Sequence, residues 1–409
     1  MIRNLKLQTI SIITSLALAF TLLGKDFDTY LENLRKEEEL FRVRQQQGAE
    51  LILQQQRAHA TKSRREFVQW RREKERKFRE YREQIINKWG EFITPSNTQW
   101  VEYSSDGESV SYVDFKTGTV TIEILNHSKD QEEDIIDKIT ESVERVVSSR
   151  GSGCVIPVHT DEDDKAIHEK PILKDQVQLR DGTPVEPTNA DALVNELKTE
   201  GKIETLPAQI PGSFKTVISF PLAPEHLQKR MEPYLPYIHK YSKKYNLRPD
   251  KILAIIHTES WFNPMAISSA NAVGLMQLVP ESGGADAYAF VYGSPAIPTQ
   301  EFLFDPKRNI ELGCAYLFIL NTRYFHAVNG TVKRNYCTIS AYNTGPGNVA
   351  FAFTGNRRIG DAIPIINSFH TEQQLFDFLT QTLPYSETRN YLQKVVERMS
   401  QYEPLYLIH

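Results

Sequence analysis

Cysteine is scarce in this chain: its 409 residues include only three, Cys154, Cys314 and Cys337. Their spacing gives neither a zinc-binding pattern nor the dense cross-linking of a small disulfide-rich domain. Because free cysteine is usually a small buried residue, we interpret the three as packing residues. A strong charge of either sign is also absent, since the net charge is -4. The overall charge therefore indicates no nucleic-acid partner.

A hydrophobic run long enough to span a membrane is missing too. The apolar stretch from Ile10 to Leu23 is shorter than the roughly 20 residues that a membrane-spanning helix needs. It follows Arg3 and Lys6, which is the layout of a secretory signal peptide. We therefore expect residues 1–24 to be a signal peptide or an uncleaved signal anchor, and the chain to be exported.

Proline is absent between Tyr30 and Trp89, a segment dense in arginine, lysine, glutamate and glutamine. This composition favours long helices. Apolar and aromatic residues recur there at roughly helical spacing, so we interpret the segment as a pair of solvated helices with one packing face. The alternative is that its excess of arginine and lysine rests on an anionic membrane surface. Composition alone does not separate the two.

From about residue 95 the pattern changes to alternating apolar and polar residues. Three such segments, separated by turn sequences, cover residues 98–103, 109–115 and 119–124. Together they predict a three-stranded antiparallel meander. Residues 135–147 form an amphipathic pattern at helical spacing, and we expect this helix to cover one face of the sheet.

Two domains follow from these patterns, after the leading residues 1–24. Residues 151–212 are polar and weakly periodic, and we interpret them as loops around one or two short helices. Residues 25–212 then form a smaller domain of helices and an antiparallel sheet. Residues 213–409 are almost wholly helical in pattern and form the second domain.

The helical half contains one carboxylate on an apolar face. A helix that begins near Pro249 carries three isoleucines along one face, and Glu259 continues that face. Burying an ionised carboxylate costs several kcal/mol, so the pKa of Glu259 should rise above its ordinary value. Because a general acid must hold its proton at neutral pH, we predict that Glu259 is catalytic.

Five short motifs follow one another in this half of the chain. They are Glu259-Ser260 with Phe262-Asn263-Pro264; Gly274-Leu275-Met276-Gln277; Phe304-Asp305-Pro306 with Asn309-Ile310; Ala341-Tyr342-Asn343 with Gly345-Pro346-Gly347; and Tyr385-Ser386-Glu387-Thr388-Arg389 with Tyr391. In this order they resemble the motifs of family 1 lytic transglycosylases. The resemblance implies an α+β protein overall, in which a mainly α-helical, goose-lysozyme-like catalytic domain follows a smaller α+β domain with an antiparallel meander.

The segment ahead of these motifs resembles the N-terminal domain of the membrane-bound lytic murein transglycosylase C subfamily. The similarity includes Trp100-Val101 and Val113-Asp114-Phe115 at the predicted strands. Members of that subfamily are lipoproteins, which implies attachment to the outer membrane through a lipobox cysteine. Here the corresponding stretch reads Leu22-Leu23-Gly24-Lys25, without cysteine. We therefore expect a periplasmic, membrane-associated protein that is not lipidated at this position.

The resemblance implies that a single glutamate cleaves the MurNAc–GlcNAc β-1,4 bond and leaves a 1,6-anhydro-MurNAc end. Ordinary glycosidases need a second carboxylate, and no other Asp or Glu lies between Glu259 and Gln277. Carried over residue by residue, the resemblance makes Glu259 the catalytic residue. It implies substrate-binding roles for Ser260, Met276, Gln277, Tyr342, Asn343, Glu387 and Tyr391.

Two other functions stay open at this point. One is a goose-type lysozyme-like muramidase that hydrolyses the same bond, and the other is a non-catalytic peptidoglycan-binding scaffold. In each case the partner is a peptidoglycan glycan strand, with the basic helices and the N-terminus as a further contact to a membrane surface. We expect neither a metal nor a cofactor, because acid–base sugar chemistry needs none and the histidines show no ligand spacing.

Overall fold

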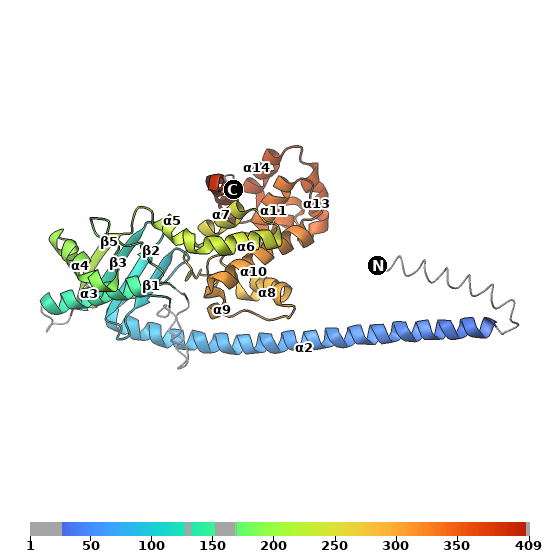
Figure 1. Cartoon of the computed structure of the whole chain (residues 1–409), viewed down its shortest axis with the longest axis horizontal. Coiled ribbons are helices and arrows are strands. Elements are labelled where there is room, and N and C mark those ends of the chain that lie inside the picture. Colours follow the sequence, from blue (N-terminus) through green and yellow to red (C-terminus); the bar gives the residue numbers. More distant parts are fainter. Residues whose placement is uncertain (1–26, 127–131, 152–167, 169, 406–409) are drawn as a thin grey trace. The chain divides into compact units, whose positions relative to one another are not determined.

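The computed structural model describes residues 27–126, 132–151, 168 and 170–405. Residues 1–62 and 63–409 are two separate units, and each is described by itself. The architecture is α+β, as predicted, with one five-stranded antiparallel sheet followed by a long series of helices (Figure 1).

Helix α2 spans Phe27–Trp89 as one continuous element of 63 residues, so the predicted pair of helices is wrong. Gly48 is the only glycine of this helix, and a glycine inside a helix costs only about 1 kcal/mol. Ion pairs one turn apart, such as Lys36 with Glu32, support the helix locally. The side chains described before residue 63 are exposed, which agrees with the predicted solvation.

The sheet has the strand order β1-β2-β3-β5-β4, and all neighbouring strands are antiparallel. Its strands are β1 (Gln99–Tyr103), β2 (Ser109–Asp114), β3 (Thr119–Asn126), β4 (Ile203–Pro207) and β5 (Phe214–Pro221). The predicted meander of three strands is therefore confirmed. Strand β4 escaped prediction because its side chains are mostly exposed and show no alternation.

The position of β5 bears on the domain boundary. The predicted boundary at residue 212 falls just before β5, and this strand pairs along its whole length with β3. A domain that ended at 212 would leave its own sheet incomplete. We therefore propose that the sheet domain extends through β5 and the helix α5 (His226–Met231) that follows it.

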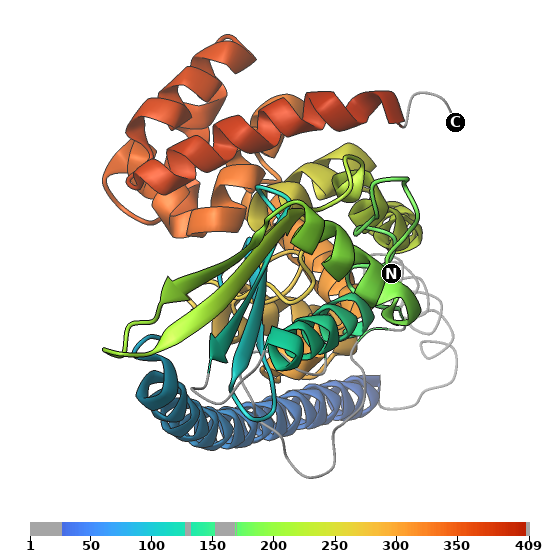
Figure 2. The same ribbon diagram turned by 90° about the vertical axis from the view of Figure 1, so that its left-hand side faces the viewer.

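Each face of the sheet is covered by helices. Helix α3 (Glu132–Ser148) packs on one face, as predicted, with α4 (Ala190–Thr199) beside it (Figure 2). On the other face Ile85 and Trp89, near the end of α2, pack in a cluster with residues such as Val101. Strands β1 to β3 are thus buried on both faces.

The second half of the chain is helical, as predicted. Its α-helices are α6 (Leu235–Tyr245), α7 (Pro249–Ser260), α8 (Ala285–Tyr292), α9 (Gln300–Phe304), α10 (Pro306–Ile319), α11 (Thr331–Thr344), α12 (Pro346–Thr354), α13 (Ile359–Ser368), α14 (Glu372–Thr382) and α15 (Ser386–Tyr402). Short 3-10 or π segments are η1 (Pro187–Asn189), η2 (Glu232–Tyr234), η3 (Pro280–Gly284), η4 (Leu320–Tyr324) and η5 (Glu403–Leu405).

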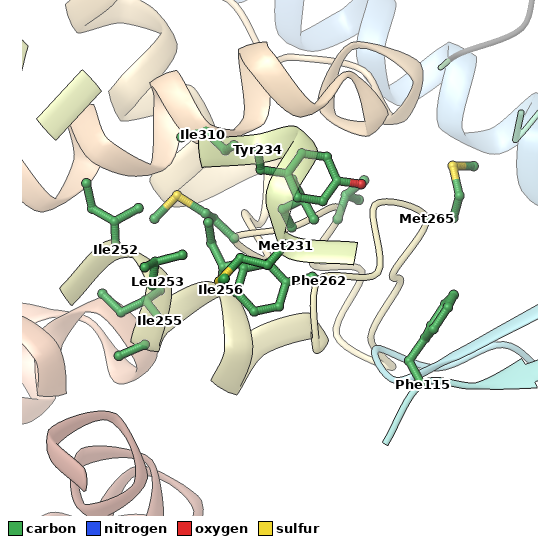
Figure 3. Packing of buried hydrophobic residues seen from close by; sticks show 14 of the residues in the cluster. Phe115, Met231, Tyr234, Ile252, Leu253, Ile255, Ile256, Phe262, Met265 and Ile310 are labelled. Carbon is green, nitrogen blue, oxygen red and sulfur yellow. The ribbon is translucent and has the colours of Figure 1, made fainter. Parts of the chain in front are cut away.

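One hydrophobic core runs through both domains. Ile252, Ile256 and Phe262 pack at and just after helix α7, and Phe115, just after β2, belongs to the same buried cluster (Figure 3). Met265 joins the cluster from the loop that follows α7. The sheet and the helices therefore bury apolar surface against each other and not only within themselves.

No helix within the described ranges is long and apolar enough to cross a membrane. The predicted signal segment, residues 1–24, lies outside those ranges. Cys314 and Cys337 are free and buried, as expected for packing residues, whereas Cys154 also lies outside the described residues.

Candidate active site

Glu259 lies one residue before the end of helix α7. The backbone of Trp261 and Phe262 then enters the left-handed region, with φ of 52° and 58°, and turns the chain away from the helix. Residues 251–257 are buried, whereas Glu259 is partly exposed. The carboxyl group therefore lies at the margin of the core, where an external molecule can reach it.

The surroundings of Glu259 favour its protonated form. The pKa of Glu259 is raised to about 8, mainly by burial and in smaller part by the charge of Glu387. The Tyr391 hydroxyl approaches the carboxyl closely enough to lower this pKa, although no well-formed hydrogen bond satisfies that hydroxyl. A carboxyl with a pKa near 8 holds its proton at neutral pH and can donate it.

Ser260 ties the end of α7 to the loop that carries the next motif. Its hydroxyl donates to the Leu275 carbonyl oxygen at 2.8 Å and to the Ile256 carbonyl oxygen at 3.1 Å. The residue is fully buried. Its hydroxyl therefore holds the loop and lies below the protein surface.

Met276 is fully buried against helix α10. A Cβ atom at Gly313 would collide with the Met276 side chain, so this close contact requires a glycine there. The resemblance implies a substrate contact for Met276, but the structure places its side chain inside the protein. Its backbone is what reaches the neighbouring motifs.

Gln277 adopts a left-handed backbone, with φ of 46°, and its side chain folds back on its own loop. The amide nitrogen donates to the carbonyl oxygens of Gly274, at 2.9 Å, and Ala266, at 3.1 Å. The amide oxygen is buried and has no hydrogen-bond partner among the described residues. This oxygen is therefore a buried acceptor whose hydrogen-bonding capacity is unused by the protein.

Tyr342 and Asn343 lie near the end of α11 and contact two other motifs. The Tyr342 hydroxyl donates to the Met276 carbonyl oxygen at 2.8 Å. The charge of Glu259 contributes to raising the pKa of Tyr342, after burial, so this ring lies near the carboxyl. Asn343 is partly exposed, and its side-chain oxygen accepts from the Thr388 hydroxyl at 2.7 Å.

Glu387 and Tyr391 both lie on α15, which packs against α7. Glu387 is exposed in the first turn, and Tyr391 is buried one turn later. The charge of Glu387 and the hydroxyl of Tyr391 both act on the Glu259 pKa. Folding thus brings Glu259, Tyr342, Glu387 and Tyr391 together from three helices.

Asn309 is a central residue of this region for which the sequence patterns predict no role. Its side-chain nitrogen donates to the carbonyl oxygens of Val273, at 2.9 Å, and Leu303, at 2.8 Å, while its oxygen accepts from the Met276 nitrogen at 2.8 Å. It also fills the space beside Gly274, where a Cβ atom would collide with it. An asparagine inside an otherwise apolar helix face is the sequence signal that could have revealed it.

Two family models match successive parts of the chain. Residues 236–363 match the family described as Transglycosylase SLT domain. Residues 62–232 match the family described as Membrane-bound lytic murein transglycosylase C, N-terminal domain. A lytic transglycosylase Slt structure from Pseudomonas aeruginosa is similar at 29% identity, covering 41% of this chain and 23% of that chain with a TM-score of 0.31.

Two relatives cover most of the chain. Membrane-bound lytic murein transglycosylase C of Serratia proteamaculans is 32% identical over 320 residues, which is 78% of this chain and 86% of the relative. The protein of the same name from Salmonella arizonae is 33% identical over 318 residues, which is 76% of this chain and 84% of the relative. The chain therefore belongs to the membrane-bound lytic murein transglycosylase C family and is a lytic transglycosylase of peptidoglycan.

Proposed function

We propose that Glu259 acts first as the general acid and then as the general base in the cleavage of the MurNAc–GlcNAc bond. The observation that carries this proposal is a partly exposed carboxyl whose pKa burial raises to about 8. In the described part of the chain, Glu387 is the one other carboxylate whose charge acts on that pKa. Because Glu387 is exposed, its carboxylate keeps its hydration and makes a weak nucleophile.

A single carboxyl is sufficient when the substrate supplies the nucleophile. The Glu259 carboxylic acid donates its proton to the glycosidic oxygen as the bond from that oxygen to the muramyl C1 breaks. The acetamido group of the muramyl residue stabilises the developing positive charge at C1. The Glu259 carboxylate then takes the proton of the C6 hydroxyl as that oxygen bonds to C1, which closes the 1,6-anhydro ring and consumes no water.

The remaining site residues fall into two groups under this proposal. Gln277, Asn343 and Glu387 contact the glycan, because each has an exposed polar atom or an acceptor without a protein partner. Tyr391 adjusts the pKa of the carboxyl. Ser260, Met276 and Tyr342 shape the loop that the glycan meets, and they do so through buried side chains and backbone groups.

Digestion of purified peptidoglycan sacculi tests the reaction. Mass spectrometry should find products that end in anhydro sugars, each lighter by one water than the hydrolysed form. The variant Glu259→Gln should give no products while still binding sacculi. Reducing ends alone would instead indicate a muramidase, and full activity of Glu259→Gln would contradict the role given to this residue.

Membrane association is a second part of the proposal. The relatives above are named membrane-bound, and α2 carries exposed arginines at positions 64, 65, 72 and 79. Such residues are attracted to anionic headgroups. We expect the full chain to bind phosphatidylglycerol vesicles better than phosphatidylcholine vesicles, and added salt should weaken the difference.

A variant with these four arginines changed to glutamine should lose the preference for anionic vesicles. The matched control changes Lys198, Lys202, Lys240 and Lys243, which are exposed elsewhere in the chain, to glutamine. If both variants lose the preference equally, net charge accounts for it and α2 has no special part. If neither does, the arginines of α2 do not mediate the binding.

A further inference from the structure

The end of the catalytic helix is held from outside its own domain. The last carbonyl groups of any helix lack partners within the helix and must find them elsewhere. In α7 the Glu259 carbonyl oxygen accepts a hydrogen bond from the Asn97 side-chain nitrogen at 3.0 Å. Asn97 precedes β1 in the sheet domain, 162 residues earlier in the chain.

A second contact of the same kind lies two residues further on. The Trp261 carbonyl oxygen accepts from Arg230 Nε at 2.8 Å. Arg230 lies on α5, between the sheet and the helical domain, and is only 2% exposed. The carbonyl oxygens of Glu259 and Trp261, the residues on either side of Ser260, thus accept hydrogen bonds from residues that precede the helical domain.

Arg230 is itself fixed by the sheet domain. Its other nitrogens donate to the Gln176 side-chain oxygen at 2.9 Å and to the Phe115 carbonyl oxygen at 3.3 Å. Its guanidinium group lies over the Phe115 ring, 4.4 Å from the ring centre. The position of the guanidinium therefore depends on the turn that follows β2.

The backbone at this point needs such support. Trp261 and Phe262 both have positive φ, a conformation that ordinary side chains adopt only where the surroundings enforce it. Phe262 is fully buried and belongs to the same hydrophobic cluster as Phe115 of the sheet domain (Figure 3). Two hydrogen bonds to this backbone, from Asn97 and Arg230, therefore come from residues that precede the helical domain.

We infer that the sheet domain is part of the catalytic apparatus, with Asn97 and Arg230 as positioning residues that hold the backbone on either side of Ser260 and thereby aim the Glu259 carboxyl. This inference rests on the proposed role of Glu259 as the acid. Neither residue touches the glycan in this arrangement. Each acts through the backbone of the catalytic helix, and a small displacement of a catalytic group is costly to the rate.

The variant Asn97→Ala tests this inference, because Asn97 is a partly exposed loop residue whose loss should leave the protein folded. We expect kcat on glycan strands to fall roughly tenfold with KM little changed. Water that reaches the released backbone should also lower the Glu259 pKa. The alkaline limb of the pH–rate profile should then move to lower pH, while Glu387 and Tyr391 still act on the carboxyl as before.

The matched control is Asn189→Ala. Asn189 lies in the same domain, and its side-chain nitrogen donates to the Pro184 carbonyl oxygen at 3.1 Å, far from α7 in the chain. This variant should lose stability without any change in kcat or in the pH–rate profile. The variant Arg230→Lys, which keeps the charge but offers fewer directed donors, should reproduce the effect of Asn97→Ala.

The outcomes separate this inference from the role of Glu259. If Glu259→Gln is inactive while Asn97→Ala keeps the parental kcat and pH–rate profile, the positioning role of Asn97 is refuted. The role of Glu259 as the general acid is then still supported. If Glu259→Gln is active, Glu259 is not the general acid, and the inference that rests on this role is refuted as well. If Asn97→Ala only lowers the melting temperature, the contact is structural and the inference is again refuted.

Discussion

The Tyr342 hydroxyl donates a hydrogen bond to the Met276 carbonyl oxygen at 2.8 Å, and so joins α11 to a loop 66 residues away in the chain. The acceptor belongs to a buried residue, so water does not replace the bond if it is lost. This contact, with those of Ser260 and Asn309, fixes the loop that faces Glu259.

The variant Tyr342→Phe should therefore lower the free energy of unfolding by about 1–2 kcal/mol, because a buried carbonyl group loses its donor. Urea denaturation measures the change, and Tyr385→Phe, at an exposed tyrosine, is the control. We expect activity to fall only modestly. Lost activity with unchanged stability would show instead that the hydroxyl acts on the substrate.

The variant Glu259→Gln should be more stable than the parent at pH 8 but not at pH 4. The pKa of Glu259 is about 8 in the folded protein against an ordinary 4.5, so the folded state keeps a proton that the unfolded state releases. The parent therefore loses stability as pH rises from about 4.5 to 8. We expect a gain of about 2 kcal/mol at pH 8, less than the full pKa rise implies, because Glu259 is partly exposed.

Thermal unfolding at the two pH values measures this gain. The control is Glu397→Gln, at an exposed position on α15. Its effect on stability should be small and the same at both pH values. An equal effect of Glu259→Gln at pH 4 and pH 8 would mean that the carboxyl is not protonated in the folded protein at neutral pH.

Two neighbours should shift the alkaline limb of the pH–rate profile in opposite directions. The Tyr391 hydroxyl lowers the Glu259 pKa, so Tyr391→Phe should raise it and move the limb to higher pH. The Glu387 charge raises the same pKa, so Glu387→Gln should move the limb to lower pH. The second shift should be small, since Glu387 is exposed and water screens its charge. Shifts in the same direction would contradict this arrangement.

The variant Gly313→Ala should cost about 1–3 kcal/mol, because its Cβ atom would collide with the Met276 side chain. The control is Gly360→Ala on α13, where a Cβ atom meets nothing within 4 Å and alanine should stabilise the helix by about 0.5–1 kcal/mol. A neutral Gly313→Ala would show that Met276 can move aside. In that case the close contact with Met276 does not require glycine at position 313.

Local patterns in the sequence predicted much of the fold. Alternation gave the meander of β1 to β3, and helical spacing gave α3, α7 and α15. The Asp305-Pro306 pair marked the start of α10, where the Asp305 carboxylate accepts from the Arg308 nitrogen at 2.8 Å. In each of these elements the signal lies within a few consecutive residues.

The features that local sequence patterns do not predict share a physical cause. Strand β4 has no buried side to create alternation, and β5 finds its partner some 95 residues earlier in the chain. The roles of Asn309 and Arg230 come from hydrogen bonds to segments distant in sequence. The predicted elements show where Glu259 is, but not what holds the backbone around it.

The hydrophobic core shared by the sheet and the helices has a consequence for any attempt to separate them. Cutting the chain after α5 would expose the buried faces of Phe115 and Met265 to water and remove the donors to the end of α7. We therefore expect the uncut segment from 63 to 405 to melt in a single cooperative transition. The two halves differ in architecture, yet neither is an interchangeable module.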